Sequence, residues 1–237
     1  MLNPDIDIIL PCYNPPAGWD RVVIEQLEML RKQLPDKHIR AIVVNDGSDS
    51  NIAGESMERL EETARDLLLL SYPINKGKGF AIRTGVQHSL ASVIVYTDID
   101  FPYTTESMIQ VILPVIQREA DVTLAIRNET YYSQLPPGRR WMSKILRAVN
   151  RSVLRLHTSD TQGGLKAFSR DVRETFLQTQ INRYLFDLEF VYLISKKREL
   201  RIRMIEADLR EGIRMSPVRL QIILRESLNF LKVLIKR

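Results

Sequence analysis

Short apolar runs alternate with segments of helical periodicity along most of this chain. Residues 6–10 form a β-branched run, and residues 20–34 place Val23 and Leu27 on one helical face. The same alternation predicts further strands at 41–44, 68–72, 92–97, 121–126, 166–169 and 202–207. It predicts further helices at 57–67, 79–90, 105–117, 139–156, 170–178, 184–197 and from Pro217 onward. Pro114 should end or kink the helix in which it lies.

Strands that are separated by helices indicate βαβ units, so we expect an α/β fold with a largely parallel sheet. Ligands of such sheets bind at the carboxyl ends of the strands, and polar residues that follow a strand are therefore the first site candidates. We expect one catalytic unit over residues 1–216, followed by a basic amphipathic helix over 217–237 that is not a separate domain.

Composition removes several classes of protein from consideration. The 237 residues are 44% hydrophobic and 27% charged, which is typical of a globular chain. One Cys excludes a disulfide framework and a Cys-based zinc site, and three His exclude a His-rich metal site. No apolar run approaches the roughly 20 residues that span a bilayer, and the first residues carry no secretory signal, so we expect a cytoplasmic protein.

The net charge of +5 is unevenly distributed. Residues 1–195 sum to −2, whereas residues 196–237 sum to +7. The predicted helix 139–156 carries one line of cations, here called the basic stripe: Arg140, Lys144, Arg147, Arg151 and Arg155. The stripe has no interleaved aromatic residues for base stacking, which disfavours nucleic acid and favours an anionic membrane surface. The alternative is a core-packed helix with a solvated basic face.

The segment Thr97-Asp98-Ile99-Asp100 places two carboxylates directly after the fourth predicted strand. Mg²⁺ and Mn²⁺ take oxygen ligands and commonly share them with phosphate groups, so this pair is a candidate metal clamp. The alternative is a solvated turn that caps the following helix, because carboxylates favour helix N-termini.

Polar segments follow the other predicted strands as well. Asp46 follows the second strand and could accept hydrogen bonds from a nucleobase or ribose, while Gly47 allows a ligand to approach the backbone closely. The alternative is a simple Asx turn. Residues 11–14 put an aromatic ring and an amide after the first strand. Residues 75–79, Asn-Lys-Gly-Lys-Gly, precede a helix but lack the spacing of a P-loop or of a dinucleotide fingerprint, which disfavours both classes.

The order of these segments, PCYN, NDGS, NKGKG and TDID, resembles the family 2 glycosyltransferases of the GT-A fold. Residues 159–166, SDTQGGLK, resemble the D-T-x-x-G-x-K/R stretch of the dolichol-phosphate mannose synthase and polyprenyl-phosphate glycosyltransferase branch. Residues 186–189 resemble its F-D-x-E, and residues 210–216 match its basic loop imperfectly. The resemblance implies a Rossmann-like, mostly parallel sheet that is flanked by helices, with amphipathic helices at the membrane interface.

On the donor side, the resemblance implies that Asp46 contacts the nucleotide base and that Asp98 and Asp100 hold Mg²⁺ or Mn²⁺ on the diphosphate. The full set of implied donor contacts is Pro11, Tyr13, Asn14, Asp46, Lys78 and Asp98. Where this branch commonly has Gln as a further metal ligand, the chain has Pro102, whose side chain cannot coordinate.

On the acceptor side, the resemblance implies that a group of polar residues binds a lipid phosphate: Arg127, Arg139, Ser143 and Arg214. It implies that Arg210 faces the phosphates and takes part in catalysis with Asp100. Asp187 or Glu189 could act as a general base if the acceptor were a hydroxyl group. The alternative for these two acids is a pair of charges at a helix N-terminus.

The resemblance therefore implies an inverting, metal-assisted transferase that moves a sugar from a GDP- or UDP-sugar to a polyprenyl- or dolichyl-type phosphate. We expect it to act as a peripheral protein on the cytoplasmic face of a membrane. The alternative is a family 2 enzyme that glycosylates a saccharide hydroxyl in the synthesis of a cell-surface polysaccharide. Whether the chain forms a homo-oligomer is left open by the sequence.

Overall fold

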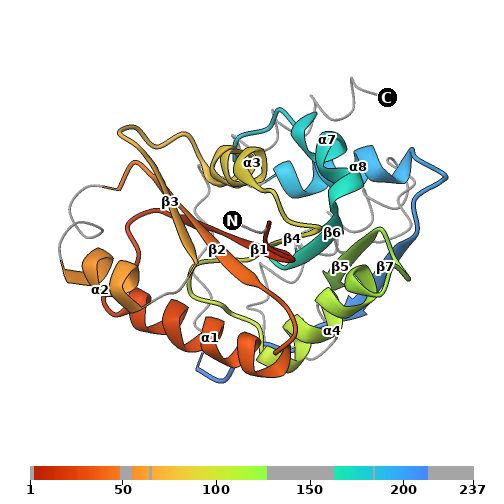
Figure 1. Cartoon of the computed structure of the whole chain (residues 1–237). Coiled ribbons are helices and arrows are strands. Elements are labelled where there is room, and N and C mark those ends of the chain that lie inside the picture. The colour runs from red at the N-terminus through yellow and green to blue at the C-terminus, as the bar shows by residue number, and fades with distance from the viewer. Residues whose placement is uncertain (1–2, 49–54, 64–65, 127–162, 184, 213–237) are drawn as a thin grey trace.

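The computed structural model describes residues 3–48, 55–63, 66–126, 163–183 and 185–212 (Figure 1). Strands and helices alternate within that part of the chain, as the periodicity predicts. The strands are β1 (Ile6–Cys12), β2 (Ile39–Asp46), β3 (Leu67–Tyr72), β4 (Val93–Tyr96), β5 (Val122–Ile126), β6 (Lys166–Ser169) and β7 (Ile202–Glu206). The helices are α1 (Trp19–Gln33), α2 (Glu55–Thr63), α3 (Lys78–His88), α4 (Thr105–Ile116), the 3₁₀ turn η1 (Arg170–Val172), α7 (Arg173–Leu177) and α8 (Phe186–Ser195).

The strands form one sheet in the order β3-β2-β1-β4-β6-β5-β7. Strand β1 lies between β2 and β4, and its Ile6 pairs in parallel with Ile39 of β2 and with Val93 of β4. Strand β6 pairs antiparallel with both β4 and β5, and β7 is parallel to β5. The expected α/β fold with a mostly parallel sheet is therefore confirmed.

Helices cover both faces of this sheet, with α1 and α4 on one face and α3, α7 and α8 on the other (Figure 1). The alternation of side chains along β1 serves both layers. Ile8 and Leu10 are fully buried in the cluster that contains Leu27 of α1. Ile9 is fully buried in the opposite cluster, which contains Phe190 of α8. Strands with two buried faces explain why the predicted strands are continuous apolar runs.

Most element boundaries differ from the expectations by a few residues, and Leu67, predicted to end a helix, begins β3 instead. Helix α4 does not end before Pro114 but continues to Ile116. Because Pro114 lies in the last turn, it removes one backbone bond only, and its carbonyl accepts bonds from the N–H groups of Glu119 and Ala120. The predicted helix 170–178 is split into η1 and α7, and α8 is shorter at both ends than predicted.

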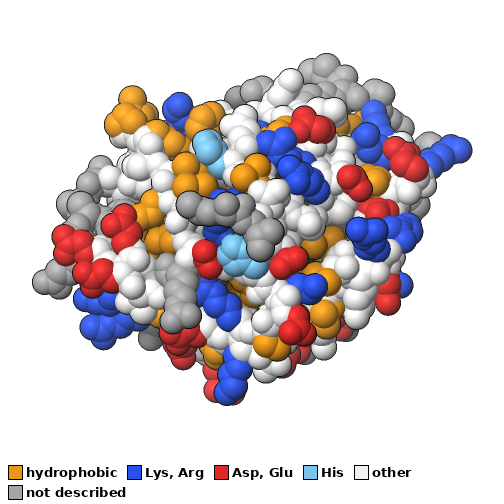
Figure 2. Space-filling model, in the orientation of Figure 1, with side chains coloured by type: hydrophobic (Ala, Val, Ile, Leu, Met, Phe, Trp, Pro, Cys, Tyr) orange, Lys and Arg blue, Asp and Glu red, His pale blue; other side chains and the backbone are white. Residues whose placement is uncertain are grey.

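Charged side chains of the described residues are interspersed on the face in Figure 2, without a large region of one sign. The predicted helices 139–156 and 217–237 lie outside the described residues, and so does the basic stripe. The division into a catalytic unit and a terminal helix thus stays a prediction. Of the helices that the structure describes, none has the length and apolar character that a bilayer crossing requires.

Candidate active site

The carboxyl ends of β1, β2 and β4 meet at one edge of the sheet because these strands are parallel. The segments that follow them are joined there by side-chain bonds. The N–H of Asn14 donates to Oγ of Ser48 at 2.9 Å. Nζ of Lys78, at the start of α3, lies 2.6 Å from Oδ1 of Asp98 after β4. The structure therefore brings the four strand-end segments of the sequence pattern to one place.

Residues after β1 present an exposed surface at this edge. Tyr13 is 51% exposed, the largest exposure of any Phe, Tyr or Trp among the described residues. Asn14 has a positive φ of 44°, which turns the chain away from the sheet and allows the bond to Ser48. Pro11 is partly buried next to this pair. An exposed ring beside a turn can stack on a flat ligand. This is compatible with the prediction that Tyr13 lines the pocket of a nucleotide base.

Asp46 is almost completely buried, and its carboxylate is directed at the loop before α3. One oxygen accepts the N–H of Lys76 at 2.7 Å, and the other accepts the N–H of Gly77 at 2.9 Å and the amide of Asn75 at 3.0 Å. Burial and the nearby Asp46 carboxylate raise the pKa of the Tyr72 hydroxyl. Asp46 thus organises the loop, and its predicted contact with a base stays a prediction.

The loop at residues 75–79 is also held from its other side. Gly77 has a φ of +106°, and a Cβ there would lie 2.4 Å from the carbonyl oxygen of Asn182. That same carbonyl accepts the N–H groups of Gly79 at 2.8 Å and of Phe80 at 3.3 Å. Only glycine fits this backbone at position 77. The first turn of α3, which carries Lys78, is therefore fixed by protein contacts on both sides.

Asp98 and Asp100 lie in the turn that follows β4. The Asp98 side chain is 41% exposed and pairs with Lys78. Burial, followed by the negative charge of Asp98, raises the pKa of the Asp100 carboxyl. Arg210 stabilises the turn, since its guanidinium donates to the carbonyls of Asp100 at 2.5 Å and Phe101 at 2.6 Å. The two aspartates thus share one small, electronegative site.

The glycine pair before β6 passes directly beside this turn. A Cβ on Gly164 would lie 2.9 Å from Oδ2 of Asp98, and the Gly164 N–H donates to the Tyr103 hydroxyl at 2.9 Å. The buried Nζ of Lys166 donates to the Gly163 carbonyl at 2.7 Å. Close backbone approach of this kind is a normal use of glycine, because a side chain at either position would collide with the neighbouring protein atoms.

The two acids at the start of α8 are both buried. Oδ1 of Asp187 accepts bonds from Nζ of Lys166 and from the Tyr96 hydroxyl, each at 2.6 Å. Oε2 of Glu189 accepts the backbone N–H groups of Gln180 and Ile181, each at 2.8 Å. These acids therefore lie beneath the site and bind protein groups. Their predicted catalytic role is not tested by this arrangement.

Residues 7–177 match the family model described as Glycosyl transferase family 2, and this span contains all four strand-end segments. The chain belongs to glycosyltransferase family 2.

Several curated relatives match most of this family 2 chain. Dolichyl-phosphate beta-glucosyltransferase ALG5D of Trichomonas vaginalis is 22% identical over 96% of this chain and 72% of its own length. The dolichyl-phosphate beta-glucosyltransferase of Drosophila melanogaster is 26% identical over 90% of this chain and 70% of its own length. The dolichyl-phosphate beta-glucosyltransferase of Dictyostelium discoideum is 25% identical over 81% of this chain and 62% of its own length. The chain thus spans about two thirds of these relatives.

Solved structures with the same arrangement identify the fold of this family 2 enzyme as GT-A. Mannosyl-3-phosphoglycerate synthase from Rubrobacter xylanophilus superposes with a TM-score of 0.69 at 14% identity, covering 99% of this chain and 74% of that one. Glucosyl-3-phosphoglycerate synthase from Mycobacterium tuberculosis gives 0.62 at 16% identity, covering 98% and 78%. That structure is a complex with Mn²⁺, UDP and phosphoglyceric acid.

The chemistry of Asp98 and Asp100 fits a divalent cation. Burial and the negative charge of Asp98 both disfavour the charged form of Asp100, and a cation beside the two carboxylates would offset both effects. The described residues contain no group of three or more His, Cys, Asp or Glu side chains that could hold a metal. A Mg²⁺ or Mn²⁺ ion on this pair would therefore complete its shell with diphosphate oxygens and water, as Mg²⁺ commonly does.

The four residues assigned to the acceptor phosphate, Arg127, Arg139, Ser143 and Arg214, lie outside the described residues. Sequence reasoning assigned no role to four residues that bond to the segments of the site: Tyr96, Tyr103, Lys166 and Asn182. The signal for Lys166 was present, because it ends the SDTQGGLK stretch. The other three have no local pattern that distinguishes them from core or loop residues.

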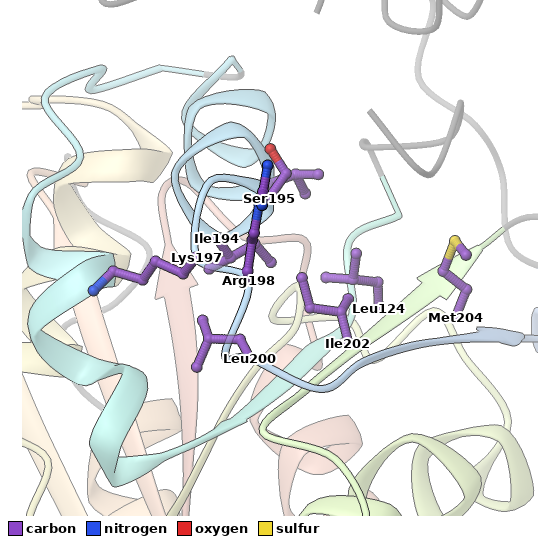
Figure 3. Close-up of a pocket in the computed structure, with 9 residues that line it drawn as sticks. Leu124, Ile194, Ser195, Lys197, Arg198, Leu200, Ile202 and Met204 are labelled. Atoms are coloured by element: carbon purple, nitrogen blue, oxygen red, sulfur yellow. The ribbon is translucent and has the colours of Figure 1, made fainter. Parts of the chain in front are cut away.

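A hollow of about 300 Å³ lies at the far end of α8, where this helix meets β5 and β7 (Figure 3). Its walls are mostly apolar, with Ser195, Lys197 and Arg198 as the polar residues. Leu200 and Ile202, which contribute to it, lie at the amino end of β7. None of its lining residues belongs to the strand-end segments, so this hollow is separate from the candidate active site.

Proposed function

We propose that this enzyme transfers a hexose from a nucleotide diphosphate-sugar to a polyprenyl- or dolichyl-type phosphate. The observation that carries the proposal is the match over 81–96% of the chain to relatives named dolichyl-phosphate beta-glucosyltransferase. Their name favours glucose as the sugar. The proposal is supported by a strand-edge site that offers two carboxylates for a cation and Lys78 for a diphosphate.

We propose that Asp98 and Asp100 hold the metal ion and that Lys78 pairs with the donor phosphates. A bound divalent cation would supply charge neutralisation for the departing nucleoside diphosphate. Nζ of Lys78 lies 2.6 Å from the Asp98 carboxylate. It could therefore leave this carboxylate and pair with a donor phosphate that binds beside it. Arg210 holds the turn through two backbone carbonyls, and this supports a positioning role for it. Pro11, Tyr13 and Asn14 would line the base pocket.

We propose that the acceptor oxygen belongs to a phosphate that is already an anion at neutral pH. Such an oxygen needs desolvation and orientation to attack the anomeric carbon, and it needs no strong base. Arg127, Arg139, Ser143 and Arg214 are the proposed phosphate contacts, because the guanidinium group matches a phosphate bidentately. The Pro217 helix and the basic stripe would bring the enzyme to an anionic cytoplasmic leaflet.

A donor and acceptor matrix tests this proposal. The full chain would be incubated with Mn²⁺ and either UDP-glucose or GDP-mannose. Each donor would be offered polyprenyl phosphate in detergent, 3-phosphoglycerate, or a free oligosaccharide, and products would be identified by mass spectrometry. We expect a glycosylated lipid phosphate only. Transfer to the oligosaccharide alone would establish the hydroxyl-acceptor alternative, and transfer to 3-phosphoglycerate alone would contradict a lipid acceptor.

Substitution of the acceptor arginines separates the two halves of the site. Arg127→Ala and Arg139→Ala should each raise the KM for polyprenyl phosphate or lower kcat, because each removes a fork of donors to the phosphate. The affinity for UDP-glucose or GDP-mannose, measured by calorimetry without acceptor, should change little. An equal loss of nucleotide-sugar affinity in both variants would show that the proposed division between donor and acceptor residues is wrong.

A further inference from the structure

Glu189 is a buried carboxylate and is therefore not a surface charge. Only 1% of the residue is exposed, on a helix that packs against one face of the sheet (Figure 1). It is two positions from Asp187 on α8, a spacing that directs the two side chains to different sides of a helix. Asp187 faces Lys166 and Tyr96, and Glu189 faces the segment at residues 179–182.

Glu189 contacts two backbone groups of that segment. Its Oε2 accepts the N–H groups of Gln180 and Ile181, each at 2.8 Å. Arg83 of α3 holds the same segment through the carbonyl of Ile181 at 2.8 Å and Oγ1 of Thr179 at 3.2 Å. The segment is therefore tied to α8 by Glu189 and to α3 by Arg83.

The next residue of the segment carries this anchorage to the candidate active site. The carbonyl of Asn182 accepts the N–H groups of Gly79 and Phe80, in the first turn of α3. A Cβ at Gly79 would lie 2.5 Å from the Ile181 carbonyl oxygen, so the two backbones are in direct contact. Lys78 immediately precedes this contact and faces Asp98. A displacement of residues 180–182 would therefore move Lys78.

We propose that Glu189 is a positioning residue for the donor diphosphate, which acts through residues 180–182 and the first turn of α3. This inference rests on the proposed function and deepens it. A phosphate acceptor that is already an anion needs no general base, so Glu189 can serve as an anchor instead. The oxygen that accepts the two N–H groups lies inside the protein. A substrate hydroxyl could reach it only by displacing the segment that it holds.

An anchor and a base make different demands on the side chain. An anchor must accept N–H groups, which the amide oxygen of Gln also does. A base must take up a proton, which Gln cannot do, and loss of a general base typically costs about 10²–10⁴-fold in rate. Glu189→Gln should therefore preserve function under our proposal and abolish it under the alternative, whereas Glu189→Ala should impair function under both.

The experiment measures UDP and UDP-glucose affinity by calorimetry with Mn²⁺, together with kcat and KM, for Glu189→Gln, Glu189→Ala and Arg83→Met. We expect Glu189→Gln to stay within threefold of the wild type in affinity and kcat. We expect Glu189→Ala and Arg83→Met to lose at least tenfold in nucleotide affinity. Arg83→Met keeps the test valid if Glu189→Ala does not fold. Glu199→Ala, at an exposed acid just beyond α8, is the matched control and should match the wild type.

Hydrogen exchange provides a readout that does not depend on activity. Peptides that cover residues 77–83 and 178–183 should exchange faster in Glu189→Ala and at the wild-type rate in Glu189→Gln. A large loss of kcat in Glu189→Gln with unchanged nucleotide affinity would overturn the proposal, as would unchanged exchange in Glu189→Ala. If the wild type bound neither UDP- nor GDP-sugars, the proposed function would fail, while the exchange data would still decide whether Glu189 is the anchor.

Discussion

Asp46→Asn is the most informative single substitution, because this one carboxylate joins the end of β2 to the loop before α3. Its two oxygens accept the N–H groups of Lys76 and Gly77 and the side-chain amide of Asn75. Asn offers one oxygen in place of two. The NH₂ group that replaces the second oxygen would face groups that are themselves donors, and Gly77 or Lys76 would lose its short bond.

The expected loss can be estimated from the bonds that change. A hydrogen bond to a charged group contributes about 1.5–3 kcal/mol, and a buried donor without a partner costs about 1–3 kcal/mol. The remaining oxygen keeps one backbone N–H, and the Asn75 amide can turn over to present its oxygen. We therefore expect the free energy of unfolding to fall by about 2–4 kcal/mol, which is toward the upper end for single substitutions.

Equilibrium urea unfolding, followed by circular dichroism, measures this loss directly. Asp36→Asn removes the same charge from an exposed turn and should change stability by no more than about 0.5 kcal/mol. If Asp46→Asn were equally harmless to stability, Asp46 would not hold the loop. If it were harmless to stability but abolished binding of UDP and GDP, the carboxylate would contact the base, as the resemblance implied.

Four further predictions concern the metal turn, the thiol and the membrane. Asp100→Asn should lower turnover at least tenfold, a barrier increase of about 1.4 kcal/mol, with an unchanged Tm; wild-type turnover would reject the metal clamp. Gly164→Ala places a methyl 2.9 Å from the Asp98 carboxylate, so Mn²⁺ affinity in titrations should fall, while Tm should hold because the carboxylate can rotate. Burial raises the pKa of the Cys12 thiol to about 12, so Ellman's reagent at pH 8 should modify it only after denaturation; rapid reaction in the native state would contradict that burial. Changing the last four cations of the basic stripe to Gln should remove about 4 kcal/mol of attraction to anionic vesicles in low-salt co-sedimentation, and equal pelleting would mean that the stripe faces elsewhere.

The sequence was sufficient for the fold class and for the convergence of the strand-end segments at one edge of the sheet. Buried strands must be continuous apolar runs, and parallel strands must end at the same edge, so PCYN, NDGS, NKGKG and TDID had to converge once the βαβ pattern was recognised. The contact of Lys78 with Asp98, from segments about 20 residues apart along the chain, is the direct consequence. It was therefore predictable which residues share that edge, because this depends only on the direction in which the strands run.

The direction of β6 was decided only by the tertiary structure. Its four residues are an ordinary buried strand in sequence, yet they run antiparallel between β4 and β5. Nothing local to a short apolar run specifies its neighbours, since pairing depends on which long connections can be packed. This insertion brings Lys166 beside Tyr96 and sets Gly164 against Asp98.

The orientation of the acids was also beyond the sequence. The sequence identified Asp46 by its place after a strand, and Asp187 and Glu189 by their resemblance to the F-D-x-E stretch of the family. In the structure each of the three is buried and accepts hydrogen bonds from protein groups. Asp46 accepts from Lys76, Asp187 from Lys166, and Glu189 from Gln180. The residue type is a property of the sequence, whereas the choice between ligand and protein partner depends on which donors the folded chain brings within hydrogen-bond distance.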